Sequence, residues 1–245
     1  MSYYKDDPRF AATALAPAHP ITTLPASGEL RSLAATYNTI GGLVDALAGA
    51  LAIDPMAVLA VWYVESGSYP FVPNKPVLRF ENHKFWKYWG VKHPAVFDQH
   101  FRFGGHPDPG KPQSNHMFRN PVTAPWHPFH GDQAREYEVF DFAAQISDLD
   151  SACMSASFGG TQVMGFNHDA LGYADAASLF KAFGADLRWQ VLGFFDFCKS
   201  NGLIRDIKDQ AWTDFGAGYN GDGGTYGPRL AAAFALKAKF LALPR

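Results

Sequence analysis

The segment Ile53-Asp-Pro-Met-Ala-Val-Leu-Ala-Val-Trp-Tyr-Val-Glu-Ser-Gly67 predicts an apolar helix that carries a carboxyl group in its last turn. Asp54 is a suitable N-cap, and Pro55 fits the first helical position, where its missing N–H is no loss. Gly67 suits the position just after the last turn, since glycine adopts the left-handed conformation without strain. We therefore expect a helix over about 55–66.

Glu65 continues the apolar face of this helix, because Val58, Val61 and Trp62 lie seven, four and three residues before it. The negative end of the helix dipole and burial beside Trp62 both disfavour a charged carboxylate, so both raise its pKa. A carboxyl group in this state suits a general acid. On the helix alone a second interpretation stays open, in which Glu65 is structural and is solvated or paired with an arginine.

Length and composition indicate a globular protein built as one large domain or as one domain with appendages. The chain has 245 residues, of which 47% are hydrophobic and 18% charged. The 21 Lys and Arg against 23 Asp and Glu give a net charge of −2, so nucleic acid is not an expected partner. Aromatic residues reach 15%, which fits stacking on sugars, although most rings belong to a core of this size.

The two cysteines, Cys153 and Cys198, lie far apart in a chain without a recognisable secretion signal, so we expect free, buried thiols. No run of about 18 apolar residues is present, so no membrane insertion is expected. These observations predict a product made in the cytoplasm. A substrate outside the membrane would require another component for delivery.

The hydrophobic pattern predicts a mainly helical domain over 31–245 with a small β element, after a proline-rich N-terminal extension over 1–30. The extension is expected to be an extended arm, packed on the surface or partly disordered. Predicted elements are a helix over 29–51 broken at Gly41-Gly42, a strand over 77–81, helices over about 83–89, 136–146, 149–155, 175–183, 185–200 and 209–215, a glycine-rich turn over 216–224, and a last helix opened by Pro228.

The segment over about 90–133 is rich in proline, glycine and histidine and lacks periodicity, so we expect a long irregular insertion. His127 and His130 have a spacing that zinc can use, but no acidic or cysteine partner with metal-site spacing lies nearby in the sequence. We therefore expect solvated loop histidines, no metal and no cofactor.

Four separated motifs resemble one family. They are Val-Glu-Ser-Gly at 64–67, Arg-Phe-Glu-Asn-His-Lys-Phe at 79–85, Ser-Ala-Ser-Phe-Gly-Gly-Thr-Gln-Val-Met-Gly-Phe-Asn at 155–167, and Gly-Tyr-Asn-Gly at 218–221. Together they resemble the N-acetylmuramidase domain of phage endolysins and bacterial cell-wall hydrolases, a branch similar to the lysozyme-like superfamily. The resemblance runs from about 53 to 240. This chain departs from the pattern at Gly160-Thr161, where the family usually has an apolar residue before the glutamine.

This resemblance implies an α+β, lysozyme-like fold and hydrolysis of the β-1,4 bond between N-acetylmuramic acid and N-acetylglucosamine in peptidoglycan. It implies Glu65 as the general acid, since glycoside cleavage needs a proton on the leaving oxygen. Glu81 is the candidate second catalytic carboxylate. Three roles stay open for it: activation of water, stabilisation of the cation, or an ion pair with Arg79 or Lys84 that holds the loop.

The resemblance also implies residues that line a sugar cleft. The candidates are Ser157, Gln162, Asn167, Tyr219 and Asn220. Amide and hydroxyl groups orient sugar acetamido and hydroxyl groups, but in Ser157 and Gln162 they can also form hydrogen bonds within a turn.

Three alternatives share parts of this prediction. A lytic transglycosylase would use the muramic acid 6-hydroxyl instead of water and give an anhydro product. An interbacterial toxin would use the same chemistry and be neutralised by an immunity protein. A non-catalytic module would only bind glycan. We expect a monomer that acts in the periplasm or the cell wall after release by a holin or delivery by a secretion system.

Overall fold

The computed structural model describes residues 3–67, 71–108, 111 and 113–245. Parts of the predicted extension (1 and 2) and of the predicted insertion (109, 110 and 112) lie outside the described residues. The helices are α1 Pro8–Ala11, α2 Gly28–Leu51, α3 Pro55–Ser66, α4 Asn82–Tyr88, α5 Pro94–His100, α6 Gln133–Ile146, α7 Leu149–Met154, α8 Ala176–Ala185, α9 Leu187–Ser200, α10 Ile204–Lys208, α11 Trp212–Asn220, α12 Gly223–Phe234 and α13 Lys237–Leu241. The strands are β1 Leu78–Phe80, β2 Phe101–Arg102, β3 Met117–Phe118, β4 His127–Pro128, β5 Ala156–Phe158 and β6 Val163–Met164, and the 3-10 helices are η1 Tyr4–Asp6, η2 Gly90–Lys92 and η3 Gly165–Leu171.

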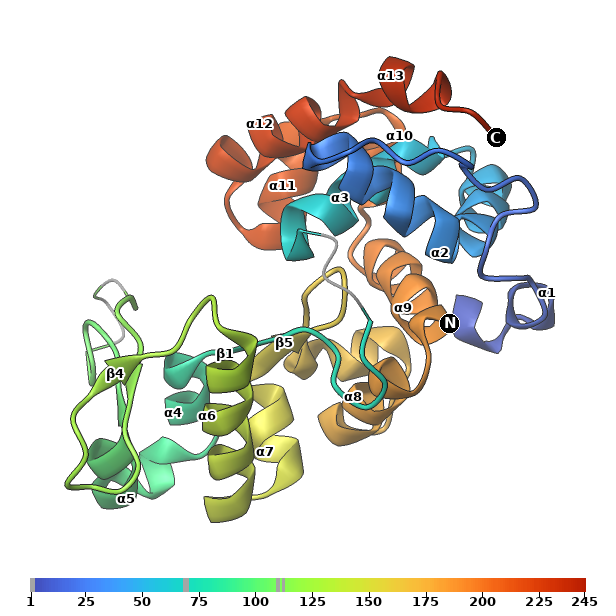
Figure 1. Ribbon diagram of the computed structural model, residues 1–245. Coiled ribbons are helices and arrows are strands. Elements are labelled where there is room, and N and C mark those ends of the chain that lie inside the picture. Colours follow the sequence, from blue (N-terminus) through green and yellow to red (C-terminus); the bar gives the residue numbers. More distant parts are fainter. Residues whose placement is uncertain (1–2, 68–70, 109–110, 112) are drawn as a thin grey trace.

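The elements form two groups that are joined near β5 and α9 (Figure 1). Helices α2, α3, α11, α12 and α13 make up one group, and α4 to α7 with the short strands make up the other. This arrangement is mainly helical with small antiparallel sheets, as predicted.

The helix predicted over about 55–66 is confirmed as α3. The Asp54 carboxylate accepts a hydrogen bond from the Met56 N–H, and Gly67 adopts the left-handed conformation at φ 61°. Most of the helix is buried, so its apolar sequence is explained by packing on several sides.

The predicted break at Gly41-Gly42 is wrong, because α2 runs without interruption from Gly28 to Leu51. A side chain on Gly41 would overlap the Tyr37 ring, and one on Gly42 would overlap the carbonyl oxygens of Ala14 and Ala16. Gly42 therefore allows the N-terminal segment to cross the helix at close range, whereas Gly41 makes room for the ring of Tyr37 on the same helix.

The N-terminal segment is packed on the rest of the chain. Phe10 and Ile21 are buried, and the Tyr4 and Lys5 N–H groups donate to the carboxylate of Asp196 on α9, at 2.6 and 3.3 Å. Of the two possibilities left open for this segment, the structure shows the packed arm for residues 3–30.

Strands β1, β5 and β6 form one antiparallel sheet in that order, with Leu78 opposite Phe158 and Phe80 opposite Ala156. The predicted strand and the helix after it are confirmed within one or two residues. Glu81 stands between β1 and α4 as the N-cap residue, beyond the end of the strand.

The predicted insertion is not irregular. It contains α5 and a second antiparallel sheet, β2-β3-β4, and the rings of Phe97, Phe101 and Phe118 are fully buried in it. The Asn82 side chain donates hydrogen bonds to the carbonyl oxygens of Arg102 and Met117, which fixes this sheet to the start of α4. Strands of two residues are too short to give an alternating pattern, so the sequence could not reveal them.

The predicted glycine-rich turn and the helix start at Pro228 are also wrong. Helix α11 continues to Asn220, and α12 begins after the N-cap Asp222 with Pro228 inside it. A side chain on Gly216 would be 3.2 Å from the backbone of α12, so this glycine allows the two helices to pack closely. Only Gly221, at φ 85°, makes the turn between them.

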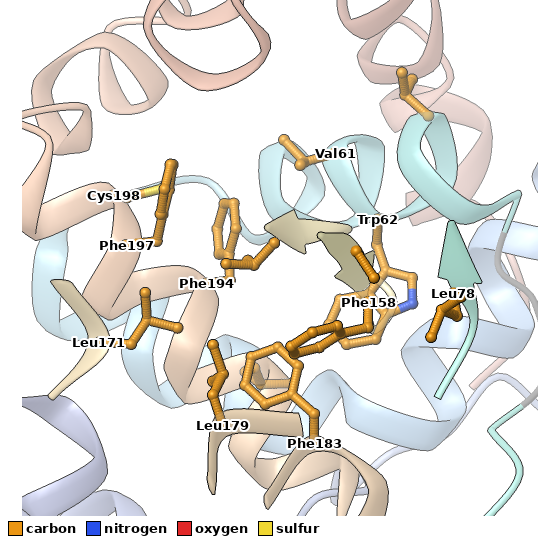
Figure 2. Close-up of a cluster of buried hydrophobic side chains, with 14 of the residues drawn as sticks. Val61, Trp62, Leu78, Phe158, Leu171, Leu179, Phe183, Phe194, Phe197 and Cys198 are labelled. Atoms are coloured by element: carbon orange, nitrogen blue, oxygen red, sulfur yellow. The ribbon is translucent and has the colours of Figure 1, made fainter. Parts of the chain in front are cut away.

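The core joins α3, the first sheet and α9, and Figure 2 shows its apolar side chains, among them Trp62, Phe158 and Phe194. Cys153 and Cys198 are both buried and free, as predicted. Among the described residues, no helix is long and apolar enough to cross a membrane.

Gly160, in the turn between β5 and β6, lies directly against the indole of Trp62, and its N–H donates to the Gln190 side chain at 2.8 Å. We expect Gly160→Ala to lower the free energy of unfolding by about 1–3 kcal/mol, because its methyl group would overlap the indole. The matched control is Gly49→Ala, at an exposed position of α2 with open space around it. We expect this change to raise the free energy of unfolding by about 0.5–1 kcal/mol. Urea unfolding of both variants measures the difference. Equal effects of the two changes would contradict the packing argument.

Candidate active site

Glu65 lies in the last turn of α3 and retains partial contact with solvent. Burial, the largest influence, raises the pKa of its carboxyl group to about 7, although Tyr226, Arg229, Arg79 and Asn220 act in the opposite direction. A carboxyl group with this pKa holds its proton for a substantial part of the time at neutral pH. The sequence-based expectation of a raised pKa thus agrees with the structure, with burial as the main cause.

Tyr226 makes the shortest contact with this carboxyl group, because its hydroxyl donates a hydrogen bond of 2.6 Å to Glu65 Oε1. Tyr226 lies on α12 and is almost fully buried. Burial and then the charge of Glu65 raise the pKa of Tyr226 far above its usual value, so its hydroxyl remains a donor. Sequence reasoning missed this residue because it lies between the predicted turn over 216–224 and the predicted helix start at Pro228, whereas α12 already begins at Gly223. The helical spacing of Tyr226, Leu230 and Ala233 was the available signal.

Arg229 was also missed. Its guanidinium group donates a hydrogen bond of 3.0 Å to the carbonyl oxygen of Val64, near the C-terminal end of α3. A cation at this position offsets the negative end of the helix dipole and limits the rise of the pKa of Glu65.

Tyr219 and Asn220 occupy the last turn of α11, and both are brought to the Glu65 side of the molecule. Asn220 interacts with the Glu65 carboxyl group and lowers its pKa. The Tyr219 hydroxyl donates to the carbonyl oxygen of Thr161 at 2.7 Å, and its ring stacks on the ring of Tyr226 with centroids 6.2 Å apart. Tyr219 therefore ties α11 and α12 to the turn between β5 and β6.

Ser157 and Gln162 form a closed set of hydrogen bonds around this same turn. The Ser157 hydroxyl donates to Gln162 Oε1 at 2.9 Å, and Gln162 Nε2 donates to the carbonyl oxygens of Val77 and Gly159. Gln162 has φ 50°, so its side-chain bonds hold a backbone conformation that non-glycine residues rarely adopt. The structure thus shows the hydrogen bonds within the turn that were one of the two alternatives for this pair.

The departure from the family pattern at Gly160-Thr161 does not loosen this region. Thr161 is fully buried, and Gly160 allows the turn to pack on Trp62. Asn167 lies beyond the turn on η3, where it is half-buried.

Glu81 has an environment opposite to that of Glu65. Burial would raise its pKa, but the neighbouring His83, His116 and Arg79 outweigh burial and hold the pKa at about 2. Arg79 Nε lies 2.8 Å from Glu81 Oε1, so the ion pair with Arg79 that was predicted as one alternative is present. Lys84 is directed to the Phe166 ring instead. Two carboxyl groups with pKa values moved apart are typical of acid–base sites.

Arg79 is the electrostatic link between the two carboxyl groups. It is ion-paired with Glu81, and its charge also lowers the pKa of Glu65. The two glutamates named from the sequence therefore belong to one charged region.

The histidines of the insertion differ from expectation. His130 does have an acidic neighbour, because its Nδ1 lies 3.0 Å from Glu136 Oε1, and Glu136 is buried. Glu136 is 55 residues away from Glu81 in the sequence, but its carboxylate accepts a hydrogen bond from the N–H of Phe80, the residue before Glu81. The fold therefore brings Glu136 and His130 close to Glu81. The expectation of solvated loop histidines is therefore wrong for His130, and His116 is buried as well.

Comparisons with known proteins bear on the family and the fold of this chain. The family model of N-acetylmuramidase matches residues 54–237. Among solved structures, the chain is similar to that described as "Crystal structure of Burkholderia AP3 phage endolysin", with a TM-score of 0.58 and 23% sequence identity over 81% of this chain and 70% of that chain. At this identity the similarity concerns the fold alone, and it agrees with the predicted mainly helical class with a small β element. Among curated proteins, none matches.

Proposed function

This chain belongs to the N-acetylmuramidase family of peptidoglycan-cleaving glycoside hydrolases, and from that premise we propose that it cuts the β-1,4 bond between N-acetylmuramic acid and N-acetylglucosamine with Glu65 as general acid. The observation that carries this proposal is the state of Glu65, a partly exposed carboxyl group with a pKa of about 7. A general acid works best with a pKa near the working pH.

The proton of Glu65 passes to the glycosidic oxygen as the bond to the anomeric carbon breaks. The carboxylate that remains is stabilised by the hydroxyl of Tyr226, which already donates to Oε1. Asn220 and Arg229 favour the same charged product state. The surroundings of Glu65 thus keep the proton in the resting enzyme and accept the negative charge after transfer.

Two outcomes are possible for the positive charge at the anomeric carbon. Attack by water gives a reducing-end muramic acid, whereas attack by the sugar's own 6-hydroxyl gives an anhydro product. We propose hydrolysis, and mass spectrometry of muropeptides released from purified peptidoglycan tests it, since the two products differ by one water. A product population made entirely of anhydro sugars would contradict hydrolysis and leave the role of Glu65 intact.

For Glu81, the contacts favour a positioning role over direct chemistry. One carboxylate oxygen is paired with Arg79 and the other faces His83 and His116. We propose that it holds Arg79 near Glu65. Ser157, Gln162, Asn167, Tyr219 and Asn220 remain proposed sugar-site residues, and Asn220 has the best support because it interacts with Glu65.

Tyr226→Phe tests the acid directly. The hydroxyl stabilises the ionised form of Glu65, so its removal raises the pKa of Glu65, and the alkaline limb of the rate–pH profile moves up by about one pH unit. The matched control is Tyr137→Phe, which removes a similar hydrogen bond of 2.6 Å to the carbonyl oxygen of Pro76 and should leave the limb in place. An alkaline limb that stays unmoved in Tyr226→Phe, or that moves to lower pH, would contradict the assignment.

A further inference from the structure

Three potential metal ligands from distant parts of the chain meet beside β1. Glu81 precedes α4, His116 precedes β3, and His130 follows β4. One ligand atom from each of the three lies within 4.8 Å of the other two. Glu81 Oε2 and His116 Nδ1 are 3.3 Å apart, and the rings of His116 and His130 have centroids 4.7 Å apart.

The surroundings of His130 leave its Nε2 atom with a lone pair. Glu136 accepts the Phe80 N–H with one oxygen at 2.8 Å and faces His130 Nδ1 with the other at 3.0 Å. A carboxylate in this arrangement places the proton of the neutral ring on Nδ1. Among the residues that the structure describes, nothing donates a hydrogen bond to the buried Nε2, so its lone pair is available to a cation.

The surroundings of His116 lead to a similar result for the opposite nitrogen. His116 Nε2 lies 3.3 Å from the carbonyl oxygen of Gln113, which can only accept, so the proton belongs on Nε2. The lone pair is then on Nδ1, which receives a long bond of 3.3 Å from the Asn82 N–H. At the same distance Nδ1 faces the acceptor Glu81 Oε2. Two acceptors that face each other in a buried place favour a cation between them.

We propose that Glu81, His116 and His130 bind a divalent cation of the zinc class. Two imidazoles and one carboxylate form a ligand set that zinc uses in proteins, and ligands at tetrahedral zinc lie about 3.3 Å apart, which matches the Glu81–His116 separation. Glu136 behind His130 and the Gln113 carbonyl behind His116 are the outer partners that orient metal-binding histidines. The three ligand atoms lie within 4.8 Å of one another, and we expect a bound ion to draw them closer to tetrahedral spacing.

His83 supplies a candidate for the fourth position. Its Nδ1 is buried, has no hydrogen-bond partner in the described part of the chain, and lies 3.4 Å from Glu81 Oε2. A bound ion would join the β2-β3-β4 sheet to the end of β1. Through the other oxygen of Glu81 it would also fix the position of Arg79. The proposed ion therefore has a structural role and is linked to the proton donor Glu65 through Arg79.

The test uses the full chain, purified without a histidine tag and treated with a chelator. Titration calorimetry with zinc chloride should show one ion per chain, and zinc at about 100 times the dissociation constant should raise the Tm by about 5 °C. His116→Ala and His130→Ala should each weaken binding at least about tenfold. The matched control is His127→Ala, the other member of the sequence-predicted pair. Its Nδ1 faces the carbonyl oxygen of Pro128 and its ring packs on Phe118, so its loss should leave affinity unchanged.

A second measurement does not depend on variants that fold. Cobalt(II) added to the chelator-treated wild type should give the visible absorption bands of a tetrahedral ion, and zinc should abolish them. Absence of zinc binding to the wild type would show that the cluster is only a hydrogen-bonded network and would overturn the proposal. Binding that survives both His116→Ala and His130→Ala, or that is lost in His127→Ala, would overturn it as well.

Discussion

Glu65→Gln is expected to reduce the release of muropeptides from purified peptidoglycan by about 10³-fold, within the range that a general acid contributes. The amide has nearly the same shape and can still accept the hydrogen bond from Tyr226, but it has no acidic proton for the glycosidic oxygen. The measurement is the initial rate of release, followed by chromatography and mass spectrometry of the products.

The matched control is Glu138→Gln, which removes an exposed carboxyl group on α6 and should leave the rate unchanged. Circular dichroism of both variants verifies that the fold is retained. A folded Glu65→Gln protein that still clears peptidoglycan at the wild-type rate would refute the catalytic role of Glu65 and favour a site that only binds glycan or uses another acid.

The second large effect concerns stability and pH. The pKa of Glu65 is about 7 in the folded chain against the ordinary value of 4.5 for a glutamate in water, so between these pH values the folded state holds a proton that the unfolded state releases. Stability due to this group is therefore complete below about pH 4.5, falls as the pH rises to about 7, and stays reduced above it. The total loss is about 3 kcal/mol.

Glu65→Gln removes this titration, so the variant should exceed the wild type by about 3 kcal/mol at pH 8 and match it near pH 4. In a chain of this size, the advantage at pH 8 corresponds to a rise in Tm of about 6 to 12 °C. The pKa of Asp196, raised to about 6 mainly by burial, adds a pH dependence of the same sign, but both proteins share it, and it cancels in the difference. Urea unfolding at several pH values gives this difference directly. A gap that stays constant with pH would mean that Glu65 titrates normally.

Local signals in the sequence were sufficient where a helix depends on its own ends. Asp54, Pro55 and Gly67 defined α3 because capping and backbone preference act over a few residues. They also located Glu65 on that helix, and its partial burial then followed from the apolar residues one and two turns before it. The same reasoning correctly located the strand before Glu81.

The sequence was misleading where glycine serves packing. In α2 and α11, glycines that resemble helix breakers instead allow another segment to approach closely. Because of that error the predicted helix ended at 215, whereas α11 continues to Asn220. The prediction therefore gave neither the orientation of Tyr219 nor the approach of Tyr226 to Glu65. Contacts of this kind join residues 161 positions apart, and no local pattern encodes such a separation. The cluster of Glu81, His116 and His130 was invisible for the same reason.

The two buried thiols can report which part of the molecule becomes transiently exposed to solvent. Cys153 lies on α7 and Cys198 on α9, and burial raises the pKa of each thiol above its usual value. A thiol reagent attacks the thiolate, so each cysteine reacts only when its helix is transiently exposed to water. Labelling rates recorded separately at the two positions would therefore distinguish a molecule that opens as a whole from one in which α7 loosens while α9 stays closed.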